Sequence, residues 1–538
     1  MKNSYLLALL SAILLWLAWP PIPYTGVLLL VAFVPLLFAF ENIIRSGAAK
    51  KGRQIFLVGG LAALVWNVSC IYWVYNSVAS VMPVYAAIPI SLIPFGLGAL
   101  LMTLAFRGYY ELRKRHSIHW ALLGLTSFWI SYEYLHQSWD LAFPWMTLGN
   151  GFASSTSIFQ WYEYTGVFGG SLWIWGANAL TFLLVLSIRD GFSRTHVIRF
   201  GVALLVWILV PLSVSLIRFN SFEERINPSE IVVVQPNIDP YGKFTSISPE
   251  EQIELLISLS EDVAKVNTEF IIWPETAIAH SFGYDEELFR QHPTFYRIQQ
   301  FLDPYKNASL VSGIESYRTY SEAQTPTARE WNGVFYDHFN AVVIVENSPE
   351  LEFYHKSKLV PGVEKLPFGS ALSFMKPLFK AFGGTTGGYG SQSEPSVLYS
   401  QSGIGSAPVV CYESIWGHYV ATYTEKGAQF IAIVTNDGWW GNTSGKDQHF
   451  DYARLRAIET RRWVARAANT GISGFINQRG DVVARSDWWT TYSASQEINL
   501  NEDLTLYTRN GDLIAFIFIG LAVLSGASIV ISRRKKIV

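Results

Sequence analysis

Three short segments of the sequence place a residue capable of acid–base or nucleophilic chemistry where a strand is expected to end. Cys411 follows the apolar run PVV, Glu275 closes the segment TEFIIWPETA, and Lys356 lies in FYHKSKLVPGVEKLPFG. Sites in α/β proteins are commonly built where strands end at one edge of a sheet. We therefore treat Glu275, Lys356 and Cys411 together as a candidate catalytic set.

These residue types suit covalent catalysis by a thiol. A cysteine attacks as its thiolate, and an ordinary thiol has a pKa of about 8.5, so it needs a base or a cation beside it. Glu275 can take the proton, and Lys356 can stabilise the thiolate and then the oxyanion formed when a carbonyl is attacked. Taken singly, each residue is more often structural. Lys358 is the alternative to Lys356 as the cation, and Glu413 is an alternative to Glu275 as the base.

Other roles for the cysteines are less well supported. The chain has two cysteines, and Cys70 lies in the apolar run LVWNVSCIYWVY. We expect that run to be in a membrane, where Cys70 fills space in a helix bundle, so a disulfide with Cys411 is not expected. The histidines are scattered, and no spacing typical of zinc ligands occurs. The sequence therefore predicts neither a metal nor a cofactor.

The elements that must position this set fall into two kinds. Half of the 538 residues are apolar and only 15% are charged, which indicates a membrane protein with more than one domain. A helix needs about 20 apolar residues to cross a bilayer. Seven candidate segments precede residue 218, and an eighth begins near residue 511: 4–20, 25–41, 55–78, 83–106, 118–136, 166–188, 197–217 and LIAFIFIGLAVLSGASIVI. The first is not read as a signal peptide, because no small-residue cleavage site follows it.

Basic residues predict the orientation of these spans. Lys and Arg gather in the loops after the second, fourth and sixth spans and in the tail RRKK, whereas the opposite loops are nearly free of them. Because such residues mark the cytoplasmic side, both termini are expected inside and the polar block 218–511 outside, in the periplasm of a Gram-negative cell. The net charge of −2 gives no reason to expect nucleic-acid binding.

The polar block is predicted to be an α/β domain. Two segments have helical periodicity, 248–266 with Ser248 as its cap and 448–469. Buried strands alternating with such helices imply a sheet covered by helices. The strands are expected at 230–238, 268–277, 309–317, 340–347, 407–414, 430–441 and 471–485.

Between the fifth and sixth spans, the aromatic loop 137–165 with Trp145 is either an interfacial belt or a lip that contacts a lipid-borne substrate.

The motifs resemble those of a known superfamily. WPET, the K-x-K-L-V-P-x-x-E segment and V-C-Y-E are similar to the Glu–Lys–Cys signature of the nitrilase superfamily, and TNDGWWG (435–441) resembles another of its loops. Eight spans with such a domain before the last resemble the membrane-embedded branch, the bacterial apolipoprotein N-acyltransferases. The resemblance implies an α-helical transmembrane bundle of eight spans plus an outer-face α/β nitrilase-like domain, an α-β-β-α sandwich. The implied domains are 1–217, 218–511 and 512–538.

The resemblance also implies residue roles. Glu275 matches the general base, Lys356 the lysine that stabilises the oxyanion, Cys411 the nucleophile and Glu364 an accessory glutamate. The matching support or substrate-binding positions are Tyr412, Glu413, Asn340, Trp145 and Phe244. Phe244 stands where many members have Trp, and Gly362-Val363 replaces the commoner Phe-Gly before the accessory glutamate.

The implied reaction is an acyl transfer between two membrane-anchored substrates. The sn-1 chain of a phospholipid, commonly phosphatidylethanolamine, would pass through a thioester on Cys411 to the N-terminal diacylglyceryl-cysteine of an apolipoprotein, with ping-pong kinetics in the inner membrane. A monomer is expected. A membrane-tethered nitrilase-like amidase is the alternative, although an anchor needs only one span. A receptor or scaffold that only binds would be expected to lack one of the three catalytic residues.

Overall fold

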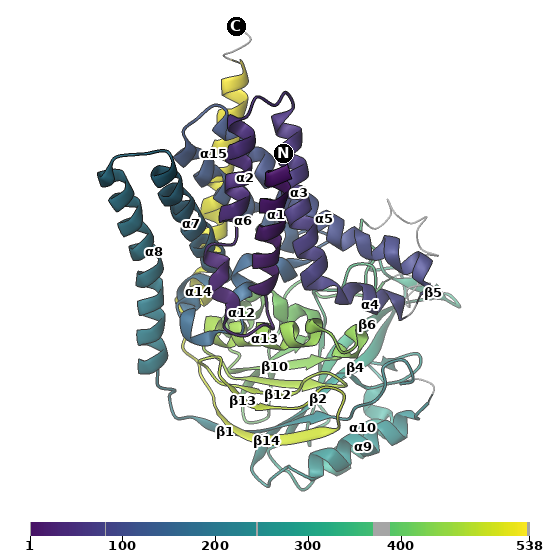
Figure 1. Cartoon of the computed structure of the whole chain (residues 1–538). Coiled ribbons are helices and arrows are strands. Elements are labelled where there is room, and N and C mark those ends of the chain that lie inside the picture. Colours follow the sequence, from purple (N-terminus) through teal and green to yellow (C-terminus); the bar gives the residue numbers. More distant parts are fainter. Residues whose placement is uncertain (1, 81, 244–245, 369–387, 535–538) are drawn as a thin grey trace. The chain divides into compact units, whose positions relative to one another are not determined.

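The structure is a computed structural model that describes residues 2–80, 82–243, 246–368 and 388–534 (Figure 1). The chain forms two compact units. Unit 1 comprises Met1–Tyr75, Val84–Ser221 and Asn510–Val538, and unit 2 comprises Asn76–Pro83 and Phe222–Arg509. Unit 1 is helical, and unit 2 contains the sheets.

Apolar helices make up unit 1, as the composition predicts. Its principal helices are α1 (Lys2–Leu17), α2 (Val34–Arg45), α3 (Lys51–Ile71), α5 (Val84–Arg113), α6 (Ile118–Gln137), α7 (Tyr162–Arg189), α8 (Arg194–Ser221) and α15 (Leu513–Arg534). Over the described part of the chain, six segments are long and apolar enough to cross a membrane: Thr25–Arg45, Lys51–Ile71, Val84–Arg113, Tyr162–Arg189, Arg194–Ser221 and Leu513–Ser532. These segments agree with the expectation of a membrane protein.

Several predicted spans have different bounds in the structure. The first apolar helix ends at Leu17 rather than at residue 20, because the Pro20-Pro21 pair that follows cannot continue it. The third ends at Ile71 instead of residue 78, and a separate short helix, α4 (Trp73–Ala79), follows it. The segment 118–136 does form a helix, α6, but it is not one of the six, and it buries polar side chains such as Glu133.

The second predicted span is interrupted. It begins as a 3-10 helix, η1 (Thr25–Leu30), and becomes α-helical only at Val34. Asn178 of α7 repairs the break: its amide nitrogen donates to the carbonyl of Leu29 at 2.7 Å, and its amide oxygen accepts from the backbone N–H of Phe33 at 2.8 Å. A helix break in an apolar setting persists only when its backbone groups find partners in this way.

Unit 2 holds two sheets. The first runs in the order β14-β1-β2-β4-β6-β5, with β3 beside β4 and β7 beside β6, and the second runs β13-β12-β11-β10-β9-β8. The strands of the first sheet are β1 (Pro228–Gln235), β2 (Thr268–Ile278), β3 (Tyr284–Asp285), β4 (Ser309–Tyr320), β5 (Arg329–Trp331), β6 (Val334–Val345), β7 (Glu352–His355) and β14 (Tyr492–Asn499). Those of the second are β8 (Leu398–Tyr399), β9 (Gly405–Val410), β10 (Phe430–Thr435), β11 (Val464–Ala468), β12 (Gly474–Ile476) and β13 (Val482–Arg485).

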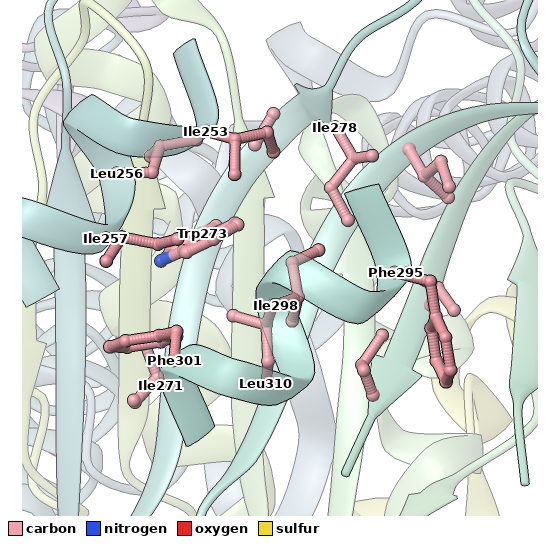
Figure 2. Packing of buried hydrophobic residues seen from close by; sticks show 14 of the residues in the cluster. Ile253, Leu256, Ile257, Ile271, Trp273, Ile278, Phe295, Ile298, Phe301 and Leu310 are labelled. Atoms are coloured by element: carbon pink, nitrogen blue, oxygen red, sulfur yellow. The ribbon is translucent and has the colours of Figure 1, made fainter. Parts of the chain in front are cut away.

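Helices α9 (Pro249–Glu261) and α10 (Pro293–Leu302) pack on the first sheet. Figure 2 shows their apolar side chains gathered around Trp273 of β2. The indole N–H of Trp273 donates to Ser260 Oγ of α9 at 2.9 Å, so its one polar atom is satisfied. Ser248 caps α9 through a complete capping box. This packing fixes β2, the strand that carries Glu275.

The two sheets also contact each other. Strand β2 contacts β10 and β11, and the rings of Phe270 and Phe430 meet edge to face with their centroids 4.9 Å apart. Helices α12 (Gly417–Glu425) and α13 (Ser444–Thr460) pack against strands of the second sheet. The ends of strands from both sheets can therefore supply one site.

The helix predicted at 448–469 ends earlier in the structure than the sequence pattern indicates. Helix α13 ends at Thr460, where Arg461 adopts a left-handed φ of 51°. The remaining residues form β11, which pairs with β10 on one side and β12 on the other. Sheet pairing therefore overrides the helical pattern, a long-range effect that periodicity cannot reveal. Likewise, the segment 471–485 forms two short antiparallel strands, β12 and β13, instead of one.

Candidate active site

Cys411 stands at a sharp turn directly after β9. It begins a 3-10 helix, η7 (Cys411–Ile415), and its φ of 48° is left-handed, which is unusual for a residue other than glycine. The side chain is only 9% exposed. The Cys411 carbonyl accepts from Ser414 Oγ at 2.8 Å and lies 3.1 Å from His449 Nε2. Such a conformation persists only where its surroundings enforce it, and it often marks a functional site.

Four buried side chains meet beside this turn. Lys356 Nζ lies 3.2 Å from Glu275 Oε1 and 2.8 Å from Glu364 Oε1. Asn340 Nδ2 donates to the same two oxygens, at 2.8 Å and 2.9 Å. An ammonium and an amide therefore bridge two carboxylates. Because β2, β6 and the loop after β7 supply them, the site depends on the register of the first sheet.

The turn 360–365 that carries Glu364 is held by its own backbone. Glu364 Oε2 accepts from the Val360 N–H at 2.8 Å, and the Glu364 N–H donates to the Val360 carbonyl at 2.9 Å. Gly362 has a φ of 85°, which favours glycine at this position. Beyond the turn, the N–H of Tyr389 donates to the Glu364 carbonyl at 2.9 Å. The Gly362-Val363 pair is thus compatible with an inward-facing glutamate.

Charges in the cluster act on both the lysine and the thiol. Burial lowers the pKa of Lys356, but the carboxylates of Glu275 and Glu364 outweigh it and hold the pKa well above its usual value. Burial raises the pKa of the Cys411 thiol, Glu275 raises it further, and Lys356 opposes them. The resting thiol is therefore protonated, and attack on a carbonyl requires a base to take its proton.

Glu413 connects the cysteine turn to the lysine loop. Its Oε1 accepts from the backbone N–H groups of Ser357 and Lys358, at 2.7 and 3.1 Å, and from the Tyr354 hydroxyl at 2.7 Å. Its Oε2 accepts from the Val410 N–H at 3.0 Å. With its oxygens occupied by these donors, the carboxylate acts as a brace between two loops, which fits the supporting role expected for it and not the role of a base.

A second buried network supports the cysteine from behind. His449 of α13 places Nε2 on the Cys411 carbonyl and Nδ1 at 2.9 Å from Asp437 Oδ1. Arg466 NH2 lies 2.6 Å from Asp437 Oδ2, and Arg466 and His449 keep the pKa of Asp437 below its usual range despite burial. None of His449, Asp437 and Arg466 is among the site residues predicted from the sequence; the carboxylate in TNDGWWG was the available signal.

Three further predicted residues have different surroundings. Tyr412 is buried and meets Trp416 edge to face, with ring centroids 4.8 Å apart. Trp145 belongs to unit 1, where its fully buried ring packs on Trp73 with centroids 4.6 Å apart. Phe244 lies outside the described residues. The Lys358 ammonium lies over the Tyr419 ring, 4.9 Å from its centre.

Comparisons with known proteins cover nearly the whole chain. Residues 11–180 match the model of the apolipoprotein N-acyltransferase N-terminal domain, and residues 231–502 match that of the carbon-nitrogen hydrolases. The chain is 29% identical to the apolipoprotein N-acyltransferase of Chlorobaculum tepidum, over 97% of this chain and 96% of that one. The chain is also 26% identical to the apolipoprotein N-acyltransferase of Geobacter metallireducens, over 100% of this chain and 96% of that one. An amidase from Nesterenkonia sp. matches 55% of this chain and 98% of its own, with 16% identity and a TM-score of 0.36.

Proposed function

Because this chain belongs to the carbon-nitrogen hydrolase family and also carries the N-terminal domain of the apolipoprotein N-acyltransferases, we propose that it N-acylates the N-terminal diacylglyceryl-cysteine of apolipoproteins, the last step of lipoprotein maturation. One observation carries this proposal: a single chain combines long apolar helices with a buried glutamate–lysine–cysteine site. A small-molecule hydrolase has no need of such helices.

The first half-reaction loads the acyl chain onto the enzyme. Glu275 takes the proton of the Cys411 thiol as sulfur attacks the sn-1 ester carbonyl of a phospholipid. Lys356, together with a backbone N–H near Tyr412, stabilises the oxyanion. The carbon–oxygen bond of the ester then breaks, and Glu275 returns the proton to the departing lysophospholipid alcohol. The product is a thioester on Cys411.

The second half-reaction transfers the acyl chain from Cys411 to the acceptor amine. The α-amine of the diacylglyceryl-cysteine attacks the thioester carbonyl, and Glu275 takes a proton from the amine. A carbon–nitrogen bond forms, the carbon–sulfur bond breaks, and the proton returns to Cys411. A thioester is energetic enough to drive amide formation without a nucleotide cofactor, and the two separate steps predict ping-pong kinetics.

The buried site supports transfer over hydrolysis. Glu275, Lys356 and Glu364 are each less than a tenth exposed, and a site that excludes water protects a thioester. Both substrates are anchored in a membrane, so an enzyme with its own membrane domain meets them in the same plane. Phosphatidylethanolamine is the proposed donor, and the protein is proposed to act as a monomer.

The proposed arrangement in the cell follows from the basic loops. Eight spans, including α1 and α6, would place both termini in the cytoplasm and the block 218–511, an α-β-β-α sandwich, on the periplasmic face of the inner membrane. Protease added to spheroplasts should cut within 218–511 and spare a tag at the C-terminus. Protection of the block and loss of the tag would contradict this orientation.

The decisive experiment looks for the acyl-enzyme. Purified protein is incubated with phosphatidylethanolamine labelled in its sn-1 chain, without acceptor, and its peptides are analysed by mass spectrometry. The label is expected on Cys411, with sensitivity to hydroxylamine as a thioester requires. Cys70→Ala should be labelled normally and Cys411→Ala should not. Label on another residue, or none, would refute the mechanism.

The same preparation separates the alternatives. A synthetic diacylglyceryl-cysteinyl peptide should discharge the label from Cys411 and carry it as an amide. An amidase would instead release ammonia from small amides and leave the lipid untouched. A protein that only binds would do neither.

A further inference from the structure

Lys243 is a buried lysine that the proposed mechanism does not use. Its side chain is 2% exposed, in the segment between β1 and α9. Its ammonium donates to Thr276 Oγ1 at 2.8 Å and to the backbone carbonyl of Glu275 at 3.4 Å. Burying an ammonium is costly unless its donors are used, and two of the three donors are used at the residue proposed as the general base and its neighbour.

The backbone that Lys243 contacts is irregular. Thr276 has a left-handed φ of 51°, and the pairing of β2 with β4 shifts register between Trp273 and Ile278. This bulge turns Glu275 out of the regular ladder and toward Lys356. A left-handed threonine persists only where its surroundings enforce it, so the bulge needs a clamp.

Other elements fix Lys243 in place. Gln252 of α9 donates its amide to the Lys243 carbonyl at 2.7 Å. The carboxylate of Glu315 on β4 also faces it: burial lowers the pKa of Lys243 to about 8, while Glu315 and Glu275 act to raise it. Glu315 in turn accepts from the Tyr389 hydroxyl at 3.4 Å. The lysine is therefore held from α9 and from the first sheet.

The geometry points to Lys243 as a positioning residue that clamps the β2 bulge and so aims the Glu275 carboxylate at Cys411. The inference rests on the proposed function only through the role of Glu275 as the base. Lys243 therefore affects the reactivity of Cys411 through Glu275 and through no other route.

The test measures the rate at which iodoacetamide alkylates Cys411 near neutral pH in a Cys70→Ser background, where one thiol remains. Lys243→Met is expected to slow alkylation by about tenfold or more, because a misplacement of about 1 Å can cost a factor of about 100. Glu275→Gln should also slow it, because losing the base that takes the thiol proton outweighs losing the negative charge that raises the thiol pKa. In the Glu275→Gln background, adding Lys243→Met should change the rate by less than about twofold, since coupled residues do not add.

Two further comparisons guard against unfolding. Lys265→Met is the matched control, because Lys265 pairs with Glu230 on β1 and not with the β2 bulge; its alkylation rate should be unchanged. If Lys243→Met does not fold, a comparison of Thr276→Ala with Thr276→Ser makes the same test. Serine keeps the hydroxyl that accepts from Lys243 and alanine lacks it, so the alkylation rate should fall only in Thr276→Ala. An unchanged rate in Lys243→Met, or an equal further loss on the Glu275→Gln background, would overturn the inference. Because alkylation needs no lipid, failure here is distinct from failure to form the acyl-enzyme.

Discussion

Lys356 Nζ lies 2.8 Å from Glu364 Oε1, and both side chains are buried. This contact gives the lysine a carboxylate partner besides Glu275. A single carboxylate paired with the lysine would be held as a neutral ion pair, whereas two carboxylates around one ammonium leave an excess negative charge in the cluster. Glu275 can therefore act as a base while the lysine stays charged.

Replacing Glu364 should weaken stabilisation of the oxyanion but leave the other residues of the site in place. Glu364→Gln keeps the shape but removes one charge that holds Lys356 in place. We expect acyl transfer to fall by about 10²-fold to 10³-fold, the usual effect of disturbing an oxyanion donor. Single-turnover loading of Cys411 measures it. Glu425→Gln, at an exposed position on α12, serves as the control and should load normally. Normal loading by Glu364→Gln would remove this residue from the mechanism.

The two lysines of the loop after β7 should differ sharply. Lys356→Met removes the ammonium between Glu275 and Glu364, and we expect acyl transfer to fall by at least about 10²-fold. Lys358→Met removes a charge that lies over the Tyr419 ring instead, and transfer should stay within about threefold of the parent, because a cation–π contact of this kind contributes only about 0.5 to 1 kcal/mol. Acyl-transfer rates of the two variants decide the assignment, and the reverse pattern would transfer the role to Lys358.

The pH dependence of Cys411 alkylation follows from its raised pKa. Burial and Glu275 favour the protonated thiol, so little thiolate is present at neutral pH and its fraction grows as pH rises. The alkylation rate should therefore climb through pH 9 without the plateau that an ordinary thiol, with a pKa of about 8.5, would give. Lys356→Met removes the cation that lowers the pKa of the thiol and should slow alkylation further. A plateau near pH 8.5 would contradict the predicted direction.

The Glu413 brace should matter for stability and rate alike. Glu413→Gln places an NH2 group where the carboxylate accepts from backbone N–H groups, leaving at least one buried donor unsatisfied. We expect unfolding free energy to fall by about 1 to 3 kcal/mol. Acyl transfer should fall with an unchanged phospholipid KM, because the lysine loop and cysteine turn lose their common anchor. Tyr354→Phe, which removes only one of the donors, should have the smaller effect on both measurements.

Gly313 should tolerate no side chain. A Cβ at this position would lie 2.5 Å from the Thr276 nitrogen and 2.6 Å from the Glu275 Cα. Gly313→Ala must therefore displace the β2 bulge, and we expect a loss of about 1 to 3 kcal/mol in stability together with a fall in kcat. Gly520→Ala adds its methyl where nothing lies within 4 Å and is the matched control. Thermal unfolding and acyl-transfer rates would test both.

Much of the fold could be predicted because its signals are local. Apolar runs predict the helices of unit 1, and short segments rich in β-branched residues predict β1, β2, β4, β6, β9 and β10. The errors share a cause. Val464–Ala468 follows a helical pattern, yet β10 and β12 recruit it as a strand, and the break before α2 depends on Asn178, far away in the sequence. Partners distant along the chain decide such cases, and periodicity carries no information about them.

By itself, the sequence determined which side chains could do chemistry: a nearly unique cysteine after a strand, a glutamate ending another and a lysine in a third segment. Only the tertiary structure decided how they meet. Strand register brings Asn340 onto Glu275 and Glu364, 65 and 24 residues away along the chain. Folding also made Glu413 a brace between two loops and buried the ring of Trp145. The physical reason is that residue type is local, whereas distance, burial and hydrogen-bond partners arise only when strands from different parts of the chain pack together.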